Sequence, residues 1–178
     1  MKNKNTLEGV SEIISNWTNE FTKQLIIGLD GCSGTGKTVL ANLLNTKHPN
    51  IVVLYLDKYS TSKEYRKKIL KNHKYPPLIY INGWHDTKKI CQDIKKFKNY
   101  AVNKKKVLLV EGVFLNNAKA YKNVFDKTIF LSLNKTQLKK RRDGRPKAAY
   151  KMFDEAWELY ESICKPIDNS DAIISVSS

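Results

Sequence analysis

The chain has 178 residues, a length that suits one domain with its own core, and we treat residues 1–178 as a single unit. Its formal charge is +15, from 32 Lys and Arg against 17 Asp and Glu, which raises the question of a nucleic-acid partner. All but four of these cations are lysines spread along the whole chain, a compositional bias that argues against nucleic-acid binding.

Cysteine usage and apolar run length bear on the compartment. Cys32, Cys91 and Cys164 lie far apart, with no C-x-x-C or Cys/His ligand spacing, which indicates free thiols in a reducing compartment. The N-terminal residues lack the apolar core of a signal peptide, and no apolar run approaches the length that spans a bilayer. We therefore expect a cytoplasmic protein without membrane association, and we make no prediction of its oligomeric state.

The pattern of apolar residues predicts strands that alternate with helices. The expected strands are 25–29, 51–56, 107–110, 128–133 and 172–174. The expected helices are a leading helix within 1–22, one ending near 45, a short one at 62–71, one from 86 or 87, one at 135–142 capped by Asn134, and one at 148–164. Strand 51–56 is apolar throughout, as in a strand buried on both faces, and residues 75–77 form an extended break. The pattern predicts an α/β fold of three layers, with about five mainly parallel strands covered by helices on both faces.

Residues 31–38 match every fixed position of the phosphate-binding motif G-x-x-x-x-G-K-[ST]. Strand 25–29 precedes the motif and helical spacing follows it, so the P-loop context is present. The glycines let backbone N–H groups surround an anion, and the helix N-terminus adds its positive dipole end. Lys37 would place a charge on the outer phosphates, and the Thr38 hydroxyl would bind Mg²⁺. The predicted nucleotide-binding residues are Gly31, Cys32, Ser33, Gly34, Thr35, Gly36, Lys37 and Thr38.

Acidic residues follow three of the expected strands, at Asp30, Asp57 and Glu111. In parallel sheets, ligands bind beyond the carboxyl ends of the strands, which brings these positions to one edge. Asp57 is a candidate general base that accepts the proton of a substrate hydroxyl, or else a turn-starting aspartate. Glu111 is a candidate magnesium-associated acid, or else a helix cap or a salt-bridge partner of Lys37.

The arginines behave differently from the lysines, because three of the four fall within residues 141–145. Arginine's planar fork suits phosphate recognition, so Arg141, Arg142 and Arg145 are candidates for phosphate contact in a short lid near 141–150. The alternative is a solvated basic helix end, where cations favour the helix dipole.

In this order, the motifs resemble the uridine kinase/phosphoribulokinase group of P-loop kinases, including its nicotinamide riboside kinase relatives, over residues 23–165. The resemblance implies a phosphotransferase that uses ATP and Mg²⁺ to phosphorylate a hydroxyl of a nucleoside-like small molecule. It implies that Asp57 is the catalytic base and Glu111 the magnesium-associated glutamate. It also implies that Arg141 and Arg142 lie at the root of a mobile lid and contact the phosphates, while Lys37 and these arginines stabilise transition-state charge.

The segments expected to bind the acceptor depart from that group's pattern. Asp57 is followed by Lys-Tyr-Ser where the group often has x-Phe-Tyr, which leaves Tyr59 as a substrate-binding candidate. Residues 82–86 read Asn-Gly-Trp-His-Asp, an imperfect match to the group's substrate segment. Trp84 is expected either to stack on a base or to belong to the core. Asp86 is expected either to bind ribose hydroxyls or to cap a helix, and His85 is expected to be structural.

Three other functions compete with this interpretation. A GTPase is suggested by Asn134-Lys135-Thr136-Gln137, but Gln137 replaces the aspartate that reads guanine, and no D-x-x-G follows a strand. A kinase of another small molecule, such as a sugar, a vitamin or a nucleoside monophosphate, fits the same motifs. A non-catalytic NTP-binding or nucleic-acid-associated protein is the third alternative, and acceptor-dependent ATP consumption distinguishes it from a kinase.

Overall fold

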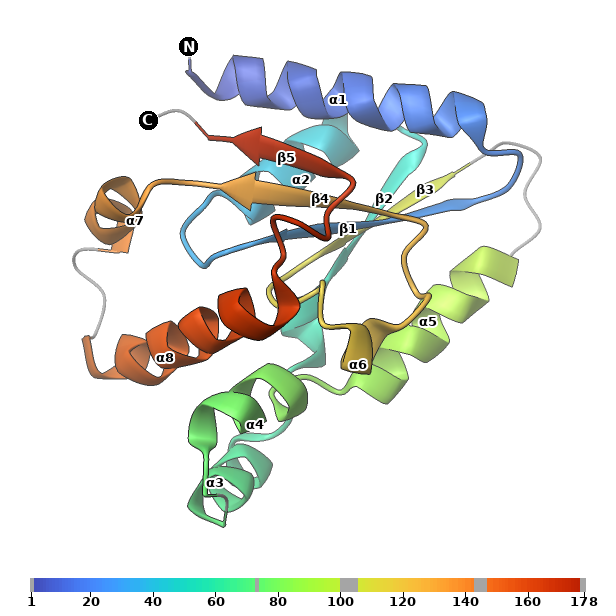
Figure 1. The fold of residues 1–178 in the computed structure, drawn as a ribbon. Helices are drawn as coiled ribbons and strands as arrows, with labels where there is room; N and C mark the ends of the chain where they lie inside the picture. The colour runs from blue at the N-terminus through green and yellow to red at the C-terminus, as the bar shows by residue number, and fades with distance from the viewer. Residues whose placement is uncertain (1, 73, 100–105, 143–146, 177–178) are drawn as a thin grey trace.

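The fold is a five-stranded parallel sheet with helices on both faces, seen in a computed structural model that describes residues 2–72, 74–99, 106–142 and 147–176. The strand order is β2-β3-β1-β4-β5, so the strand before the P-loop is central (Figure 1). All four strand pairs are parallel, as the alternation of strands and helices predicts. The strands are β1 (Leu25–Gly31), β2 (Ile51–Tyr55), β3 (Val107–Glu111), β4 (Lys127–Ser132) and β5 (Ala172–Ser175).

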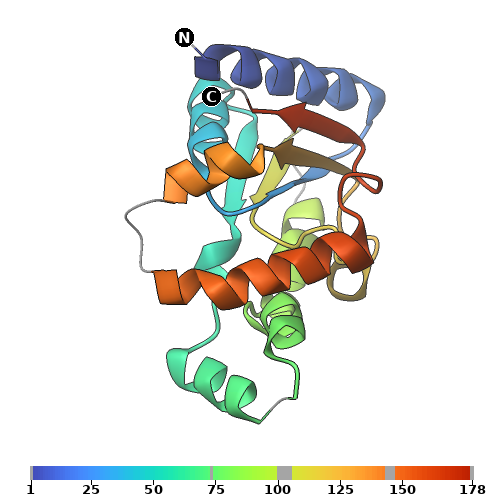
Figure 2. The same ribbon diagram turned by 60° about the vertical axis from the view of Figure 1, so that its left-hand side comes forward.

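Helices α1 and α2 cover one face of the sheet, and α5, α6 and α8 cover the other (Figures 1 and 2). Helices α3 and α4 extend beyond the sheet on the side of α8, and α7 follows β4 at the carboxyl edge of the sheet. The helices are α1 (Lys2–Glu20), α2 (Lys37–Lys47), α3 (Lys63–Lys71), α4 (Pro76–Gly83), α5 (Thr87–Asn99), α6 (Ala118–Tyr121), α7 (Lys135–Arg142) and α8 (Lys147–Cys164), with a 3₁₀ turn at Leu56–Tyr59. In the described part of the chain, no helix is long and apolar enough to cross a membrane.

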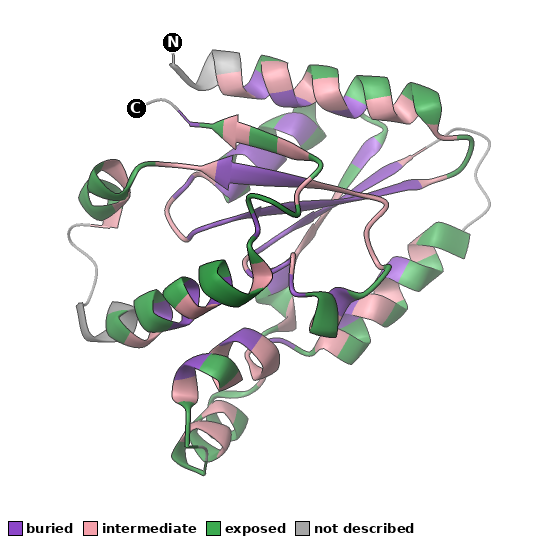
Figure 3. Ribbon diagram, viewed as in Figure 1, coloured by how far each residue is buried: buried purple, intermediate pink, exposed green. Residues whose placement is uncertain are grey.

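The core divides between the two faces of the sheet because side chains alternate along each strand. Leu25, Ile27 and Leu29 of β1 point toward α1 and α2, whereas Ile26 points toward α5. The central strands β1 and β3 are buried along their whole length, whereas α3 and α7 expose most of their surface (Figure 3). The three-layer P-loop fold predicted from the sequence is confirmed.

Two local predictions were wrong. Strand β2 is not buried on both faces, because it lies at the edge of the sheet; of its residues only Ile51 is buried, and Val52 is 38% exposed. Residues 75–77 are not an extended break, since Pro76 and Pro77 begin α4. The first helical positions need no backbone donor, so proline is tolerated there.

Candidate active site

The carboxyl edge of the sheet brings the P-loop and two acidic residues together. Strand β3 lies directly beside β1, with Glu111 in register with Leu29, and β2 lies beyond β3. The P-loop, Glu111 and Asp57 therefore follow neighbouring strands in space, although they are far apart in sequence. They line one cavity of about 780 Å³, together with Arg141 from the end of α7.

The P-loop has the backbone conformation that its glycines were expected to permit. Gly34 and Gly36 have φ angles of +94° and +97°, in the left-handed region that side chains disfavour. A Cβ atom on Gly31 would lie 2.6 Å from the carbonyl oxygen of Leu131, so the close approach of β4 also requires glycine. These glycines therefore allow the sharply turned backbone of a phosphate-binding loop.

Lys37 begins α2 and is 6% exposed. Its ammonium group donates hydrogen bonds to the carbonyl oxygens of Gly31, at 2.8 Å, and Cys32, at 3.0 Å. Burial lowers the pKa of Lys37, and the nearby carboxylate of Glu111 opposes that effect. The alternative ion pair between Lys37 and Glu111 is not formed among the described residues. Lys37 therefore holds a buried positive charge at the base of the P-loop.

Thr38 and Glu111 are joined by a hydrogen bond of 3.2 Å from the threonine hydroxyl to Oε1 of the carboxylate. Burial raises the pKa of Glu111, and the positive charge of Lys37 limits the rise. No group of three or more His, Cys, Asp or Glu side chains that could hold a metal ion occurs within the described ranges. A divalent ion at this position would therefore depend on the oxygen atoms of Thr38, Glu111 and a nucleotide's phosphates, a ligand set that suits Mg²⁺.

Asp57 lies in the 3₁₀ turn that follows β2, and its side chain is 94% exposed within the open cavity. Its Oδ1 atom is 3.7 Å from Nε2 of His85. The His85 imidazole, helped by the charge of Lys37, lowers the pKa of Asp57 against a smaller opposing effect of desolvation. Asp57 is thus an ionised, accessible carboxylate that faces the same cavity as the P-loop.

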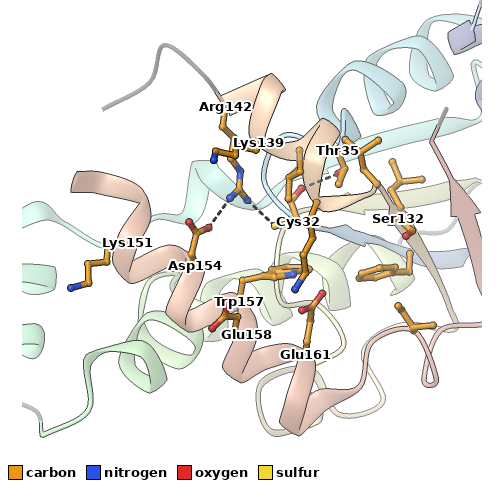
Figure 4. Close-up of a pocket in the computed structure, with 16 residues that line it drawn as sticks. Cys32, Thr35, Ser132, Lys139, Arg142, Lys151, Asp154, Trp157, Glu158 and Glu161 are labelled. Carbon is orange, nitrogen blue, oxygen red and sulfur yellow. Dashed lines mark hydrogen bonds and ion pairs between the residues drawn. The ribbon is translucent and has the colours of Figure 1, made fainter. Parts of the chain in front are cut away.

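The two arginines at the end of α7 lie on different sides of the P-loop. Arg141 lines the main cavity and donates a hydrogen bond of 3.2 Å to the carbonyl oxygen of Thr35. Arg142 instead donates to Sγ of Cys32 and, in an ion pair of 2.6 Å, to Asp154 of α8 (Figure 4). It also donates to the carbonyl oxygen of Ser33. Arg142 therefore braces the back of the loop, and the catalytic role that the sequence suggested for it stays a prediction.

The back of the P-loop opens into a second cavity of about 580 Å³ between α7 and α8 (Figure 4). Cys32 lies at this cavity, and burial raises its pKa to about 11, which keeps the thiol protonated. Cys32, Cys91 and Cys164 are all outside disulfide bonds, as expected. Arg145 lies outside the described residues, as does the central part of the expected lid.

Four residues were expected to bind the acceptor: Asp57 and Trp84 line the main cavity, whereas Tyr59 and Asp86 do not. Tyr59 donates its hydroxyl hydrogen to Asp93 of α5, at 3.0 Å. Asp86 caps α5 by accepting a 3.0 Å hydrogen bond from the backbone N–H of Lys89, which is the alternative role foreseen for it. These two side chains contribute to the placement of α5.

Trp84 is enclosed by planar groups. The Tyr80 ring stacks on it at 4.1 Å between centroids, and the Arg66 guanidinium carbon lies 4.6 Å from the ring. Trp84 thus lines the cavity while its ring contacts Tyr80 and Arg66, and its stacking on a base stays a prediction.

Three cavity residues or roles were missed by the sequence analysis. Tyr80 of α4 and Phe153 of α8 line the main cavity, as does His85, which was expected to be structural.

Asp30, grouped with the site acids by its position after β1, is fully buried and accepts hydrogen bonds from Tyr160 and Asn116. Asp30 anchors α8 to the sheet. Its strand position was correct, but the direction of its side chain could not be read from the sequence.

Several solved structures have the same fold. A structure described as a possible uridine kinase from Bacillus stearothermophilus has a TM-score of 0.76 at 18% identity, covering 98% of this chain and 100% of that chain. D-glycerate 3-kinase from Cryptococcus neoformans has a TM-score of 0.68 at 9% identity, covering 96% and 95%. Shikimate kinase from Bacteroides thetaiotaomicron has a TM-score of 0.51 at 17% identity, covering 85% and 86%.

The sequence itself matches a family model described as an AAA domain over residues 27–165. None of the curated proteins matches this chain. At such low identities the structural likenesses show the fold alone, and that fold is the one shared by P-loop kinases of several small molecules. The resemblance to the uridine kinase/phosphoribulokinase group is therefore confirmed at the level of the fold.

Proposed function

The chain belongs to the AAA domain family, and we propose that it is an ATP-dependent kinase that transfers the γ-phosphoryl group to a hydroxyl of a small, nucleoside-like acceptor. The observation that carries this proposal is the single cavity of about 780 Å³ that holds both the P-loop and the exposed carboxylate of Asp57. A nucleotide-binding regulator would need the P-loop but not an ionised carboxylate across the cavity from it.

Asp57 supplies the proton acceptor for the transfer. The acceptor's hydroxyl donates its proton to the Asp57 carboxylate as the hydroxyl oxygen bonds to the γ-phosphorus. The bond between that phosphorus and the bridging oxygen breaks, and the nucleoside diphosphate leaves with the bond's electron pair. The lowered pKa of Asp57 keeps the carboxylate ionised at neutral pH, so it is ready to accept the proton.

Positive charge around the phosphates comes from Lys37 and Arg141. Lys37 is held at the base of the P-loop, and Arg141 is fixed at the mouth by the carbonyl oxygen of Thr35. Fixed cations in a partly dry site stabilise the charge that develops on the transferring phosphoryl group. Thr38 and Glu111 would hold Mg²⁺, which neutralises phosphate charge when bound.

A hollow beside Gly36 suits the base of the donor. It has a volume of about 140 Å³, and its walls include Val39, Leu43 and Val176 next to Arg141. Val39 is 55% exposed and Leu43 is 36% exposed, although both are apolar. Exposed apolar side chains that continue from a phosphate site favour a planar, largely apolar group such as adenine.

The enclosed Trp84 favours a second candidate within the same reaction class. The Tyr80 ring and the Arg66 guanidinium already lie over the Trp84 ring, so a nucleobase would have to compete with them to stack on it. A kinase of a sugar or another polyhydroxylated molecule needs no such stacking, and it would use the same Asp57 and P-loop.

An acceptor screen tests the proposed function. The protein is incubated with ATP and Mg²⁺ and a panel of nucleosides, sugars, sugar acids and vitamins, and the products are read by the mass gain of one phosphate. We expect acceptor-dependent ADP formation with at least one hydroxylated compound. Absence of phosphorylation of every compound, together with tight and salt-sensitive binding of oligonucleotides, would instead support a nucleic-acid-associated protein.

A further inference from the structure

The cavity of about 580 Å³ behind the P-loop lies between two helices that present opposite charges to it. Helix α7 contributes Lys135 and Lys139, which are four residues apart and therefore lie on one face of the helix. Helix α8 contributes Glu158 and Glu161, which lie beside Trp157 (Figure 4), and also Lys151 nearer to its start. A pair of cations and a pair of carboxylates thus line opposite walls of one cavity.

These four charges do not meet one another across the cavity. In the part of the chain that the structure describes, no ion pair involves Lys135, Lys139, Glu158 or Glu161. Asp154 of the same helix α8 differs from them, because it is already bound to Arg142 at 2.6 Å. Opposite charges that face a common space without contact favour a ligand that carries both charges, since each end of it then meets a complementary wall.

Between the charged walls, the cavity is lined by apolar side chains from β4, α7 and α8. The rings of Phe130 and Trp157 stack at 6.3 Å between centroids, and Leu138 of α7 lies on the same cavity. Ile167, which is 47% exposed, adds an apolar group from the segment after α8. The volume lies within the range of small-molecule sites, which combine a mostly apolar lining with a few charged or polar groups. This lining suits an aromatic body.

We propose that this cavity is an effector site for a small zwitterion with an aromatic body, such as an aromatic amino acid. The ligand's carboxylate binds Lys135 and Lys139, its ammonium group binds Glu158 and Glu161, and its ring packs on the apolar lining. The cavity shares no lining residue with the main cavity, so the ligand is neither the phosphate donor nor the acceptor.

The position of the site connects it to nucleotide binding. Cys32 and Thr35 of the P-loop line the cavity, and Arg142 lies on it at the end of α7. The neighbouring Arg141 donates to the carbonyl oxygen of Thr35 at 3.2 Å and lines the main cavity. A ligand held between α7 and α8 would keep α7, and Arg141 with it, at the P-loop. ATP should therefore bind more tightly when this ligand is present, and the ligand more tightly when ATP is present.

The experiment measures binding by titration calorimetry, without nucleotide, for tryptophan and three analogues that each lack one group. Tryptamine lacks the carboxylate, indole-3-propionate lacks the ammonium group, and alanine lacks the ring. The wild-type protein is compared with two double variants, Glu158→Lys with Glu161→Lys and Lys135→Glu with Lys139→Glu. Glu155→Lys is the matched control, because Glu155 is an exposed acid of α8 that does not line the cavity. All substituted residues are exposed, and thermal unfolding shows whether each variant is folded.

For the wild-type protein we expect tryptophan to bind about fivefold more tightly than tryptamine or indole-3-propionate, the effect of an ion pair in contact with solvent. Alanine should bind about tenfold more weakly or less, because it buries no ring. Reversal of Glu158 and Glu161 should weaken tryptophan and tryptamine but not indole-3-propionate. Reversal of Lys135 and Lys139 should weaken tryptophan and indole-3-propionate but not tryptamine, and the control should bind as the wild-type protein does.

The effect on the nucleotide is measured separately. Saturating tryptophan should lower the dissociation constant of ATP by about fivefold or more, the usual size of coupling between two sites. Neither double variant should show this shift, whereas the control should keep it. This measurement requires ATP binding and no turnover, so its outcome does not depend on the identity of the acceptor.

Three outcomes would overturn the inference. Absence of tryptophan binding at millimolar concentration would exclude the site, and binding that both double variants retain would place the ligand elsewhere. Equal affinity for tryptophan and for an analogue with a single charge would show that the opposite walls do not act together. Tryptophan binding that leaves the dissociation constant of ATP unchanged would contradict the assignment of an effector site. None of these results bears on the kinase proposal, which the acceptor screen tests.

Discussion

The front and the back of the P-loop differ in how their charges are partnered. On the front, Asp57 is exposed to the cavity and lies 3.7 Å from an imidazole nitrogen that has no hydrogen-bond partner among the described residues. On the back, Arg142 is bound by Asp154, Ser33 and Cys32, and the buried Asp30 is bound by Tyr160. The charges on the back are held by other side chains of the fold, whereas the Asp57 carboxylate on the front is open to a ligand.

The contrast is sharpest at Arg141 and Arg142, which are consecutive in the sequence. Successive residues of a helix point about 100° apart, so one side chain can enter the cavity while the next lies behind the loop. A cluster of basic residues in a sequence therefore does not act as one unit. The predictions below test the two sides separately, beginning with the largest expected effect.

Among the arginine variants, replacement of Arg141 should have the largest effect. We expect Arg141→Ala to lower kcat by about 10³-fold, because an arginine that reaches the transferring phosphoryl group contributes at least that much. Steady-state kinetics with ATP and the best acceptor measures it, and Arg142→Ala is the matched control. A loss of less than tenfold for Arg141→Ala would place this residue outside the reaction.

The magnesium side of the front cavity is tested at Glu111. We expect Glu111→Gln to raise the Mg²⁺ concentration needed for half-maximal activity by about 10–100-fold, as is usual when a partner of a metal ligand is removed. The measurement is a Mg²⁺ titration at saturating ATP. An unchanged Mg²⁺ requirement would contradict the assignment of Glu111 to the metal.

The raised pKa of Glu111 also predicts that the apparent Mg²⁺ affinity depends on pH. Because burial raises its pKa, Glu111 becomes protonated at a higher pH than an ordinary glutamate does as the solution is acidified. The apparent Mg²⁺ affinity should therefore weaken as the pH falls through the titration of Glu111. In Glu111→Gln this pH dependence of the Mg²⁺ affinity should be absent. The lowered pKa of Asp57 places its own titration at still lower pH, so the two effects are separable.

The back of the loop should respond in stability rather than in chemistry. Arg142→Ala should lower the free energy of unfolding by about 1.5–3 kcal/mol, since it removes charge-assisted hydrogen bonds to the P-loop. Asp154→Asn should have a smaller effect, about 0–1 kcal/mol, because Asp154 is 53% exposed. Denaturant unfolding measures both variants. If Arg142→Ala lost turnover as strongly as Arg141→Ala without loss of stability, the proposed division of labour would be wrong.

The smallest effect is expected at Arg66, which covers one face of Trp84. Arg66→Ala should cost about 0.5–1 kcal/mol of stability through the lost cation–π contact and leave kcat nearly unchanged. The informative readout is the KM for nucleosides. A fall in that KM would show that the uncovered indole now stacks on a base, and no change would support an acceptor that does not use this face.

The sequence predicted the fold well because apolar periodicity and the P-loop motif are local signals. Asn134 caps α7 as expected, with its Oδ1 accepting from the N–H of Gln137 at 2.9 Å. The errors at β2 and at Pro76 have physical causes: strand order decides which strand is at an edge, and a proline pair can begin a helix as well as break one.

The placement of Asp57 and Glu111 at the carboxyl edge was predictable because the order of motifs fixes it, while their roles in a reaction stay predictions. The site was not predictable where a side chain's direction decides the outcome. Asp30 follows a strand as Asp57 does, yet it is buried against Tyr160. His85 approaches Asp57 only because the bridge between Ser60 and His85 joins two segments that are separated in the sequence. Such pairings are tertiary, and no local pattern contains them.

The most direct test of the central claim, that Asp57 and the P-loop form one phosphoryl-transfer site, is to compare ATP binding and turnover in Asp57→Asn. Asparagine keeps the shape and cannot accept the proton, so we expect ATP affinity to be maintained while kcat falls by about 10²–10⁴-fold. Turnover close to that of the wild-type protein, with a folded and ATP-binding variant, would contradict the account.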